Sequence, residues 1–429
     1  MSRSAVVNSW LPHNRKVLIT NRLWGFDQLE DFFETNLTVQ PFYFKVPEND
    51  LDHILRRVAD YPWHEMPDDG GWDYGTNLEY LKELCAYWVD KFDWRAQESK
   101  INSFSNFTAL VDGIDMHFIF EKGSGKNSMP LMISHGWPGS VSEFFELIGP
   151  LAHPEQFGGD IEDAFTVIVP SLPGFGFSGR PPRPYGPRKI ASVINSLMTD
   201  TLGFNGYLAQ GGDWGGAICS WLGYDHFATC SGIHINVLTM RHPDGPITDE
   251  EKLWEAQFNN DQIMQNGYRT QQATRPQTLS YAMIDSPVGI AAWLIEKFHD
   301  WSDVKTGSIE SAFSKDELLT NIMIYITTRT FNSASWIYYG RREEGGRILS
   351  PEGYRVEVPT GCAVFPEEML NWPPRSYVER IYNVEHWTEM PRGGHFAAME
   401  EPEMLVEDIR KFARHLRGKN SCKLSNNIT

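Results

Sequence analysis

The spacing of apolar and polar residues divides the chain into stretches of different predicted secondary structure. Over residues 1–100, apolar residues recur every three to four positions, most clearly at Leu51–Val58 and Leu78–Trp88, which predicts amphipathic helices. From about Asn106, short apolar runs alternate with glycine turns and helical patterns. The expected strands are Met116–Glu121, Leu131–Ser134, Phe165–Val169 and Tyr207–Ala209. Such alternation predicts β-α-β units and a mostly parallel sheet.

A helical stretch then interrupts the alternation before strands return. From about Arg241 to Gly346 the chain carries long helical patterns, at Asp249–Asn266, Gly289–Trp301 and Lys315–Thr328. Strand patterns follow at Val358–Phe365 and Val384–Met390, and an amphipathic helix is expected over Pro402–Leu416. An α/β sheet with such an insertion predicts a core that carries a helical lid, and sheets of this kind bind ligands at the carboxyl ends of their strands.

The predicted segments follow from these changes of pattern. They are an N-terminal segment (1–100), a core in two parts (101–240 and 351–417), a lid between the two parts (241–350) and a disordered tail (418–429).

Composition and charge exclude several classes of protein. Apolar residues make up 41% of the 429 residues, enough for a sizeable core, so an intrinsically disordered chain is excluded. With 38 basic and 56 acidic residues the net charge is −18, which disfavours binding to nucleic acids and to anionic membranes. The longest apolar stretch, Val288–Ile295, is too short to span a bilayer, and the first fifteen residues lack the apolar run of a signal peptide. We therefore expect a soluble, cytoplasmic protein.

Cysteine and glycine patterns exclude the common cofactor sites. The five cysteines are scattered and form no C-x-x-C pair, which argues against both a disulfide framework and a zinc site. The run Gly174–Gly179 matches G-x-G-x-x-G, but the prolines that follow it cannot open the helix that a dinucleotide site needs. No cluster of metal ligands is visible, so we expect neither a metal nor an organic cofactor.

Asp213 stands in the sequence context of a catalytic nucleophile. It lies in the run G-G-D-W-G-G, after the strand pattern 206–210 and before a helical pattern that begins at Ala217. Strand, tight glycine turn and helix form the nucleophile elbow of α/β-hydrolases, where small neighbours allow a strained turn that exposes the central side chain. The alternative is an aspartate that caps a helix, which is the commoner use of this residue.

Two further residues follow Asp213 in the chain order of the α/β-hydrolase triad, nucleophile, acid and histidine. Glu368 follows the strand pattern at Val358–Phe365, and His395 lies in a glycine turn between the last strand and the last helix. A strand pattern at Leu131–Ser134 ends in a His-Gly turn, where this fold places a donor to an oxyanion. The order of the three residues favours catalysis over the helix cap.

Several motifs together resemble the microsomal-type epoxide hydrolases, and the resemblance runs from about Pro41 to about Arg417. The motifs are H-G-W-P-G-S (135–140), P-S-L-P-G-F-G-F-S (170–178), G-G-D-W-G (211–215), D-S-P-V-G-I-A-A-W (285–293) and R-G-G-H-F-A-A-M-E-E-P (392–402). Membrane-bound members of that family carry an N-terminal anchor helix, whereas this sequence is similar to the soluble fungal and bacterial members. The resemblance implies an α/β-hydrolase core, a helical lid and an N-terminal segment that wraps both.

The resemblance also assigns roles to individual residues. It implies two lid tyrosines as proton donors, Tyr268 and Tyr338, although a slip of one residue would exchange Tyr338 for Tyr339. In the same way Glu368 is favoured over Glu367 as the acid that orients His395. The oxyanion would be held by the backbone N–H groups of Trp137 and Trp214.

The implied reaction is the addition of water to a small-molecule epoxide, which yields a vicinal diol. Asp213 would form an ester with the substrate, and His395 would then activate the water that hydrolyses it. A haloalkane dehalogenase is the alternative with the same nucleophile, and a hydrolase fold without activity is the alternative from another class. The tryptophan-rich N-terminal segment would also fit a homodimer.

Overall fold

The computed structural model describes residues 38–426 with gaps at 69, 127, 305–307 and 347–354, and it describes side chains up to residue 418. Contacts between residues group Thr38–Thr429 into one compact unit. The expectation that the chain starts without a signal peptide or an anchor helix concerns residues that lie outside this description.

Nine strands form one sheet, in the order β1-β2-β3-β5-β4-β6-β7-β8-β9. Their bounds are β1 Val39–Pro41, β2 Asn106–Val111, β3 Ile114–Glu121, β4 Met129–Ser134, β5 Phe165–Pro170, β6 Tyr207–Gly211, β7 Cys230–Ile235, β8 Val356–Val364 and β9 Tyr382–Glu389. From β5 through β4, β6, β7 and β8 to β9 every pairing is parallel, whereas β1, β2, β3 and β5 pair antiparallel. The predicted mostly parallel sheet is confirmed.

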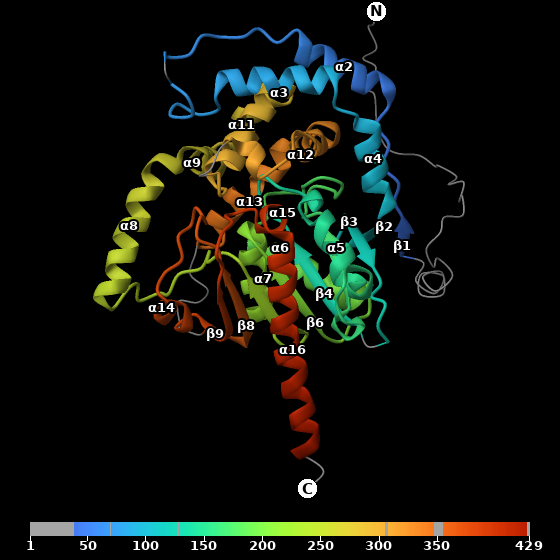
Figure 1. Cartoon of the computed structure of the whole chain (residues 1–429), viewed down its shortest axis with the longest axis vertical. Coiled ribbons are helices and arrows are strands. Elements are labelled where there is room, and N and C mark those ends of the chain that lie inside the picture. Colours follow the sequence, from blue (N-terminus) through green and yellow to red (C-terminus); the bar gives the residue numbers. More distant parts are fainter. Residues whose placement is uncertain (1–37, 69, 127, 305–307, 347–354, 427–429) are drawn as a thin grey trace, which may run out of the picture. The chain divides into compact units, whose positions relative to one another are not determined.

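Helices cover both faces of the parallel part of the sheet (Figure 1). On one face α5 (Phe145–Ala152) packs on β5, and α16 (Pro402–Asn426) packs on β8 and on α5. On the other face α7 (Asp213–Asp225) packs on β4, β6, β7 and β8, with α6 (Pro187–Ser196) beside it. Strands covered on both faces are continuous apolar runs, and every residue of β5 is accordingly buried. The predicted α/β fold class is confirmed.

The helical insertion lies between β7 and β8. Its helices are α8 (Asp249–Gln265), α9 (Gly267–Thr274), α10 (Pro276–Met283), α11 (Pro287–Asp300), α12 (Lys315–Thr328) and α13 (Phe331–Glu343). Thr248 is the N-cap residue of α8 and Ser314 is the N-cap residue of α12. Each forms a capping box with the glutamate three residues further along the chain. The expected helices at α8, α11 and α12 are confirmed, whereas α9, α10 and α13 were not predicted.

Three N-terminal helices contact the helices of the insertion. They are α2 (Glu48–Ala59), α3 (Leu78–Asp90) and α4 (Trp94–Ser103), and they pack on α11 and α12 at the top of Figure 1. The Tyr87 hydroxyl donates to Asp316 Oδ1 over 2.8 Å, and Thr76 Oγ1 donates to the Ala292 carbonyl over 2.5 Å. These contacts join the N-terminal segment to helices α11 and α12 of the insertion.

The C-terminal helix differs from its expected end. We predicted an amphipathic helix over Pro402–Leu416 and a disordered tail over 418–429, but α16 continues to Asn426. No proline follows Leu416, so every residue from there to Asn426 can donate its backbone N–H to the helix.

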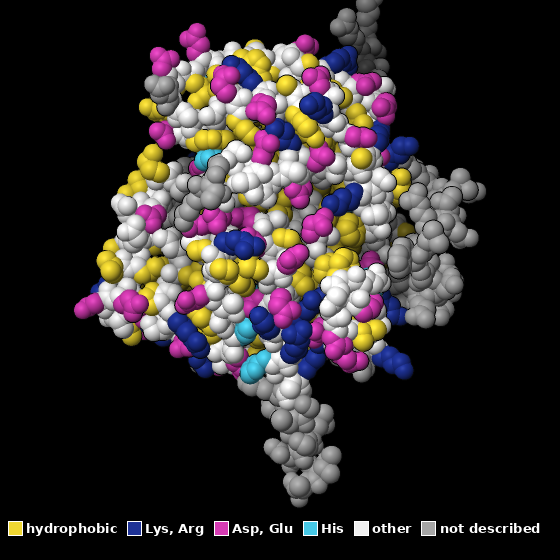
Figure 2. All heavy atoms as spheres, in the orientation of Figure 1, with side chains coloured by type: hydrophobic (Ala, Val, Ile, Leu, Met, Phe, Trp, Pro, Cys, Tyr) yellow, Lys and Arg dark blue, Asp and Glu magenta, His cyan; other side chains and the backbone are white. Residues whose placement is uncertain are grey.

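The exposed face of the molecule is chemically mixed. Acidic, basic and apolar side chains are interspersed over the face seen in Figure 2. None of the helices in the described part of the chain has the length and apolarity needed to cross a bilayer.

The short helix α14 (Arg375–Glu379) lies between β8 and β9, and α15 (Ala397–Glu400) lies between β9 and α16.

Candidate active site

Asp213 stands on a sharp turn between β6 and α7, as the sequence predicts. Strand β6 ends at Gly211, and Asp213 is the first residue of α7 with φ +44°, in the left-handed region. The turn requires glycines on both sides: a Cβ on Gly211 would lie 2.4 Å from the backbone of Gly215, and one on Gly215 would lie 2.0 Å from the Ser134 carbonyl oxygen. The strained turn lifts the carboxylate above the end of the sheet, where positive φ often marks functional residues.

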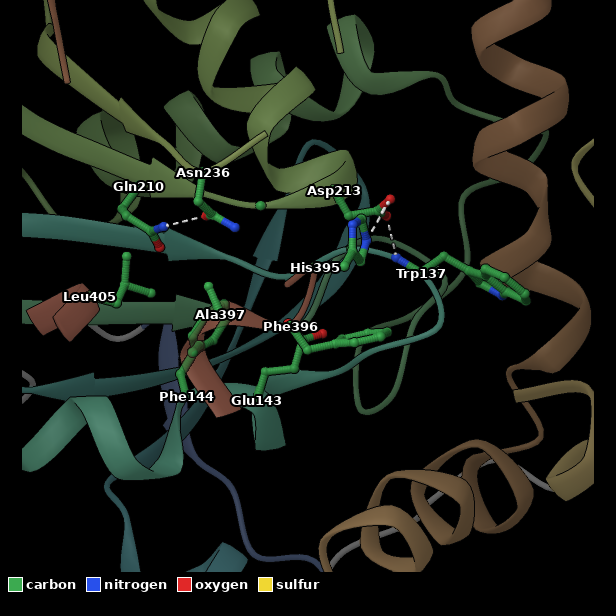
Figure 3. Close-up of a pocket in the computed structure, with 13 residues that line it drawn as sticks. Trp137, Glu143, Phe144, Gln210, Asp213, Asn236, His395, Phe396, Ala397 and Leu405 are labelled. Atoms are coloured by element: carbon green, nitrogen blue, oxygen red, sulfur yellow. Dashed lines mark hydrogen bonds and ion pairs between the residues drawn. The ribbon is translucent and has the colours of Figure 1, made fainter. Parts of the chain in front are cut away.

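Two groups contact the Asp213 carboxylate, one at each oxygen (Figure 3). The backbone N–H of Trp137 donates a 2.7 Å hydrogen bond to Oδ1, and His395 Nε2 lies 3.4 Å from Oδ2. Trp137 belongs to the loop after β4, so the structure places it where the sequence predicts an oxyanion donor. Trp214, the other predicted donor, is the second residue of α7, where a backbone N–H has no acceptor within the helix.

Glu368 holds the far side of the His395 ring. Its carboxylate oxygens lie 2.8 and 2.9 Å from Nδ1, and both side chains are 1% exposed. The N–H of Leu370 donates to Glu368 Oε1 over 2.9 Å, which fixes the carboxylate. The neighbouring Glu367 instead lies beside Gly394 through backbone pairing, so of the two glutamates Glu368 is the one that contacts His395.

The charge of His395 depends on these two carboxylates. Burial alone would lower the pKa of His395, but the carboxylates of Glu368 and Asp213 outweigh burial and raise it well above its usual value. The histidine is therefore protonated when both neighbours are ionised. Loss of the charge on Asp213 would lower the pKa of His395 and turn the ring into a base.

The loop that carries His395 is fixed by residues that the sequence analysis did not identify. Glu400 accepts hydrogen bonds from the N–H groups of Gly394 (3.0 Å), Phe396 (2.9 Å) and Asp303 (2.8 Å). Burial raises the pKa of Glu400 to about 7. The N–H of His395 donates to the Trp301 carbonyl over 2.9 Å, which joins the loop to the end of α11. Motif spacing carries no signal for such backbone contacts.

Two tyrosines of the lid face the two tryptophans beside Asp213. Tyr268 on α9 stacks on Trp137, with ring centroids 5.1 Å apart and planes 9° apart. Tyr338 on α13 meets Trp214 edge-on at 4.7 Å, and it meets Trp137 and Tyr268 at 5.7 Å each. Both tyrosines are buried. The structure therefore brings together the two lid residues that the sequence analysis paired.

Tyr338 and its neighbour Tyr339 point in different directions. Tyr338 is 3% exposed and lies in the aromatic cluster above Asp213, whereas Tyr339 is half-buried and its ring lies 5.2 Å from the Arg342 guanidinium. Burial raises the pKa of Tyr338 well above its usual value, and the nearby negative charge of Asp213 adds to the effect. Its hydroxyl is therefore protonated at neutral pH.

A pocket opens beside Asp213 on the side of His395 (Figure 3). Its walls come from the loop after β4, the turn before α7, and helices α15 and α16, and the polar residues among them are Glu143, Gln210, Asp213, Asn236 and His395. Within the described residues, no three His, Cys, Asp or Glu side chains are grouped to hold a metal ion. The arrangement places a carboxylate beside a histidine that a second carboxylate orients, and two phenols stack on the tryptophans next to that carboxylate.

Two family models match the chain. The family described as "Epoxide hydrolase N terminus" matches residues 39–144, and the family described as "alpha/beta hydrolase fold" matches residues 129–284. The first match covers the N-terminal helices and the loop with Trp137, and the second covers the turn with Asp213.

Individual relatives extend the match over most of the chain. A protein of Stigmatella aurantiaca that carries an epoxide hydrolase name is 40% identical over 89% of this chain and 86% of its own length. Epoxide hydrolase 1 of Sus scrofa is 35% identical over 87% of this chain and 88% of its own. The crystal structure of juvenile hormone epoxide hydrolase from Bombyx mori superimposes with a TM-score of 0.81 at 26% identity, over 92% of this chain and 98% of that one. The chain therefore belongs to the epoxide hydrolases, with the α/β-hydrolase fold.

Proposed function

We propose that this epoxide hydrolase works through a covalent ester on Asp213. The single observation that carries the proposal is the placement of the Asp213 carboxylate between the Trp137 N–H, 2.7 Å from Oδ1, and His395 Nε2, 3.4 Å from Oδ2. One carboxylate oxygen is held by a hydrogen bond and the other is left to react. A carboxylate is ionised at neutral pH, so it attacks without a base.

In the first half-reaction an oxygen of Asp213 attacks a carbon of the epoxide ring. A carbon–oxygen bond to the enzyme forms as the ring carbon–oxygen bond breaks. The departing ring oxygen takes a proton from Tyr268 or Tyr338, which lie on the lid side of the site. The high pKa of Tyr338 keeps this proton in place until the ring opens.

In the second half-reaction His395 removes a proton from water, and the hydroxide attacks the ester carbonyl carbon. Ester formation has removed the charge on Asp213 and lowered the pKa of His395, so the imidazolium returns the tyrosinate to a phenol and the neutral ring can act as a base. The backbone N–H groups of Trp137 and Trp214 hold the oxyanion of the tetrahedral intermediate. Collapse releases the diol, and the two protons of the water end on the diol and on His395, which restores the resting enzyme.

The pair of lid tyrosines favours an epoxide over a haloalkane. A departing alkoxide needs a proton, which a phenol supplies, whereas a halide leaves as an anion that needs only hydrogen-bond donors. We therefore propose epoxides as the substrate class and expect no halide release from haloalkanes.

Replacement of a lid tyrosine by phenylalanine should slow the first half-reaction selectively. We expect Tyr338→Phe and Tyr268→Phe to lower the alkylation rate with styrene oxide by about 10- to 100-fold, while ester hydrolysis changes little. Stopped-flow fluorescence of Trp137 and Trp214 provides the readout, because both rings lie beside the tyrosines. Tyr339→Phe is the matched control, since Tyr339 faces Arg342. An unchanged alkylation rate in both single variants and in the double variant would remove the tyrosines from the mechanism.

A further inference from the structure

A third carboxylate faces the pocket that contains Asp213 and His395, and the proposed mechanism does not use it. Glu143 lies in the short 3₁₀ helix η1 (Val141–Phe144), eight residues beyond His135, the residue that follows β4. Its side chain lines the pocket together with Asp213 and His395, and Figure 3 shows the three residues around the same space.

The backbone beside Glu143 leaves room for its carboxyl group. A Cβ added to Gly139 would lie 1.3 Å from Glu143 Oε1, so the carboxyl group occupies the space that any side chain at position 139 would take. The loop itself is held by α12: the Tyr325 hydroxyl donates to the Gly139 carbonyl over 2.9 Å, and Asn321 Nδ2 donates to the Pro138 carbonyl over 2.8 Å. The loop is therefore fixed, and the glycine lets the carboxyl group of Glu143 lie against it.

The surroundings of Glu143 favour its neutral form. Burial is the main cause that raises its pKa to about 8; the negative charge of Asp213 contributes to the rise, whereas the positive charge of His395 and a hydrogen bond with the Ser140 backbone oppose it. Of the elements packed on η1, helix α12 contributes the phenol of Tyr325, and α15 contributes apolar residues to the pocket, while Glu400 binds the backbone around His395. Besides burial, the charged groups that act on Glu143 are thus the reacting residues Asp213 and His395.

We propose that Glu143 binds the hydrolytic water and holds it between His395 Nε2 and the ester on Asp213. The inference rests on the ester mechanism proposed above. One hydrogen of the water goes to His395, and the Glu143 carboxylate accepts a hydrogen bond from the other. The water oxygen is then directed at the ester carbonyl carbon. Glu143 accepts a hydrogen bond but no proton, so the proton transfers of the second half-reaction are unchanged.

Ester formation also prepares Glu143 for this task. The charge of Asp213 raises the pKa of Glu143, and conversion of that carboxylate to an ester removes the charge. The pKa of Glu143 then falls, and more of the side chain is ionised at the step that needs an acceptor. Ester hydrolysis is expected to rise with pH as Glu143 ionises, and the rise should end below 8, because about 8 is the pKa of Glu143 beside the charged Asp213.

The test compares the two half-reactions in Glu143→Gln with styrene oxide under single-turnover conditions. We expect alkylation at the wild-type rate and ester hydrolysis slowed by about tenfold, because the neutral amide oxygen of glutamine is a weaker acceptor for the water than a carboxylate. The pH dependence of hydrolysis should lose its rise below pH 8 in this variant only. Glu146→Gln is the matched control, because Glu146 is exposed and pairs with Lys100 at 2.8 Å.

Gly139→Ala gives an independent test, because the added methyl group displaces the carboxyl group of Glu143 without removing it. We expect the same selective loss of hydrolysis, with a melting temperature close to that of the wild type. Wild-type hydrolysis and an unchanged pH profile in Glu143→Gln would overturn the role of Glu143. If no ester forms in the wild type, the proposed function itself fails, and this result is separate because ester formation is measured directly.

Discussion

Asp213→Ala is expected to lower kcat/KM for styrene oxide by about 10⁴-fold or more, because the variant has lost the atom that forms the bond to the substrate. The pocket contains a second carboxyl group, that of Glu143. We do not expect it to replace the nucleophile, because it lies on η1 and not on the turn that carries Asp213. Steady-state diol formation, measured by chromatography, is the readout. Retention of more than a few per cent of the activity would contradict the assignment of Asp213 as nucleophile.

The positive φ of Asp213 makes a second variant necessary as a control for strain in the turn. Asp213 has φ +44°, a conformation that asparagine and aspartate adopt more readily than alanine does, so alanine also strains the turn. Asp213→Asn keeps both the shape and this tolerance, and it isolates the loss of the charge. We expect it to be inactive at first and to regain activity slowly, since a water activated by His395 can hydrolyse the amide to the original aspartate. Equal melting temperatures of wild type and asparagine variant would exclude unfolding as the cause.

His395→Gln is expected to give one turnover of alkylation and then stop. Alkylation does not need the base, so the ester accumulates on Asp213, whereas hydrolysis slows by about 10²- to 10⁴-fold because no group takes the proton of the water. Mass spectrometry of the quenched protein detects the ester as an increase equal to the mass of one substrate molecule. A peptide digest should place it on the peptide that contains Asp213.

The control for this variant is a histidine away from the site. His415 lies on α16 and contacts Glu385 at 3.2 Å, so His415→Gln should turn over at the wild-type rate. A steady-state rate near that of the wild type in His395→Gln would show that another group activates the water. Absence of both ester and diol would instead show that the histidine is needed for alkylation.

The core of the fold could be predicted because its strands are buried on both faces. Runs such as 131–134 and 165–169 are apolar at all positions but one, and the helices between them have regular spacing. The lid helix α13 escaped prediction because serine, glycine and polar residues interrupt its apolar pattern, and contacts with α9 and α10 stabilise it. The antiparallel edge at β1 and β2 escaped because the spacing of apolar residues does not set the direction of a strand.

The candidate site could be predicted as far as local sequence determines it. The glycines around Asp213 are required by the turn, and the order of Asp213 and His395 at strand ends follows from the topology. Spacing alone left Tyr338 and Tyr339 as alternatives, because two adjacent residues differ only in the direction that the helix gives them. Glu143 lies outside the quoted motifs, and Glu400 lies inside one of them, but spacing gave neither residue a role, since that depends on contacts in the folded chain.

The ester on Asp213 is tested most directly by the origin of the oxygen in the diol. Excess enzyme is mixed with styrene oxide in ¹⁸O-labelled water, and the diol of the first turnover is analysed by mass spectrometry. The ester mechanism predicts unlabelled diol, because the added oxygen comes from the Asp213 carboxylate and the label enters the protein instead. Labelled diol in the first turnover would mean that water attacks the epoxide directly, which would contradict the role of Asp213 as nucleophile.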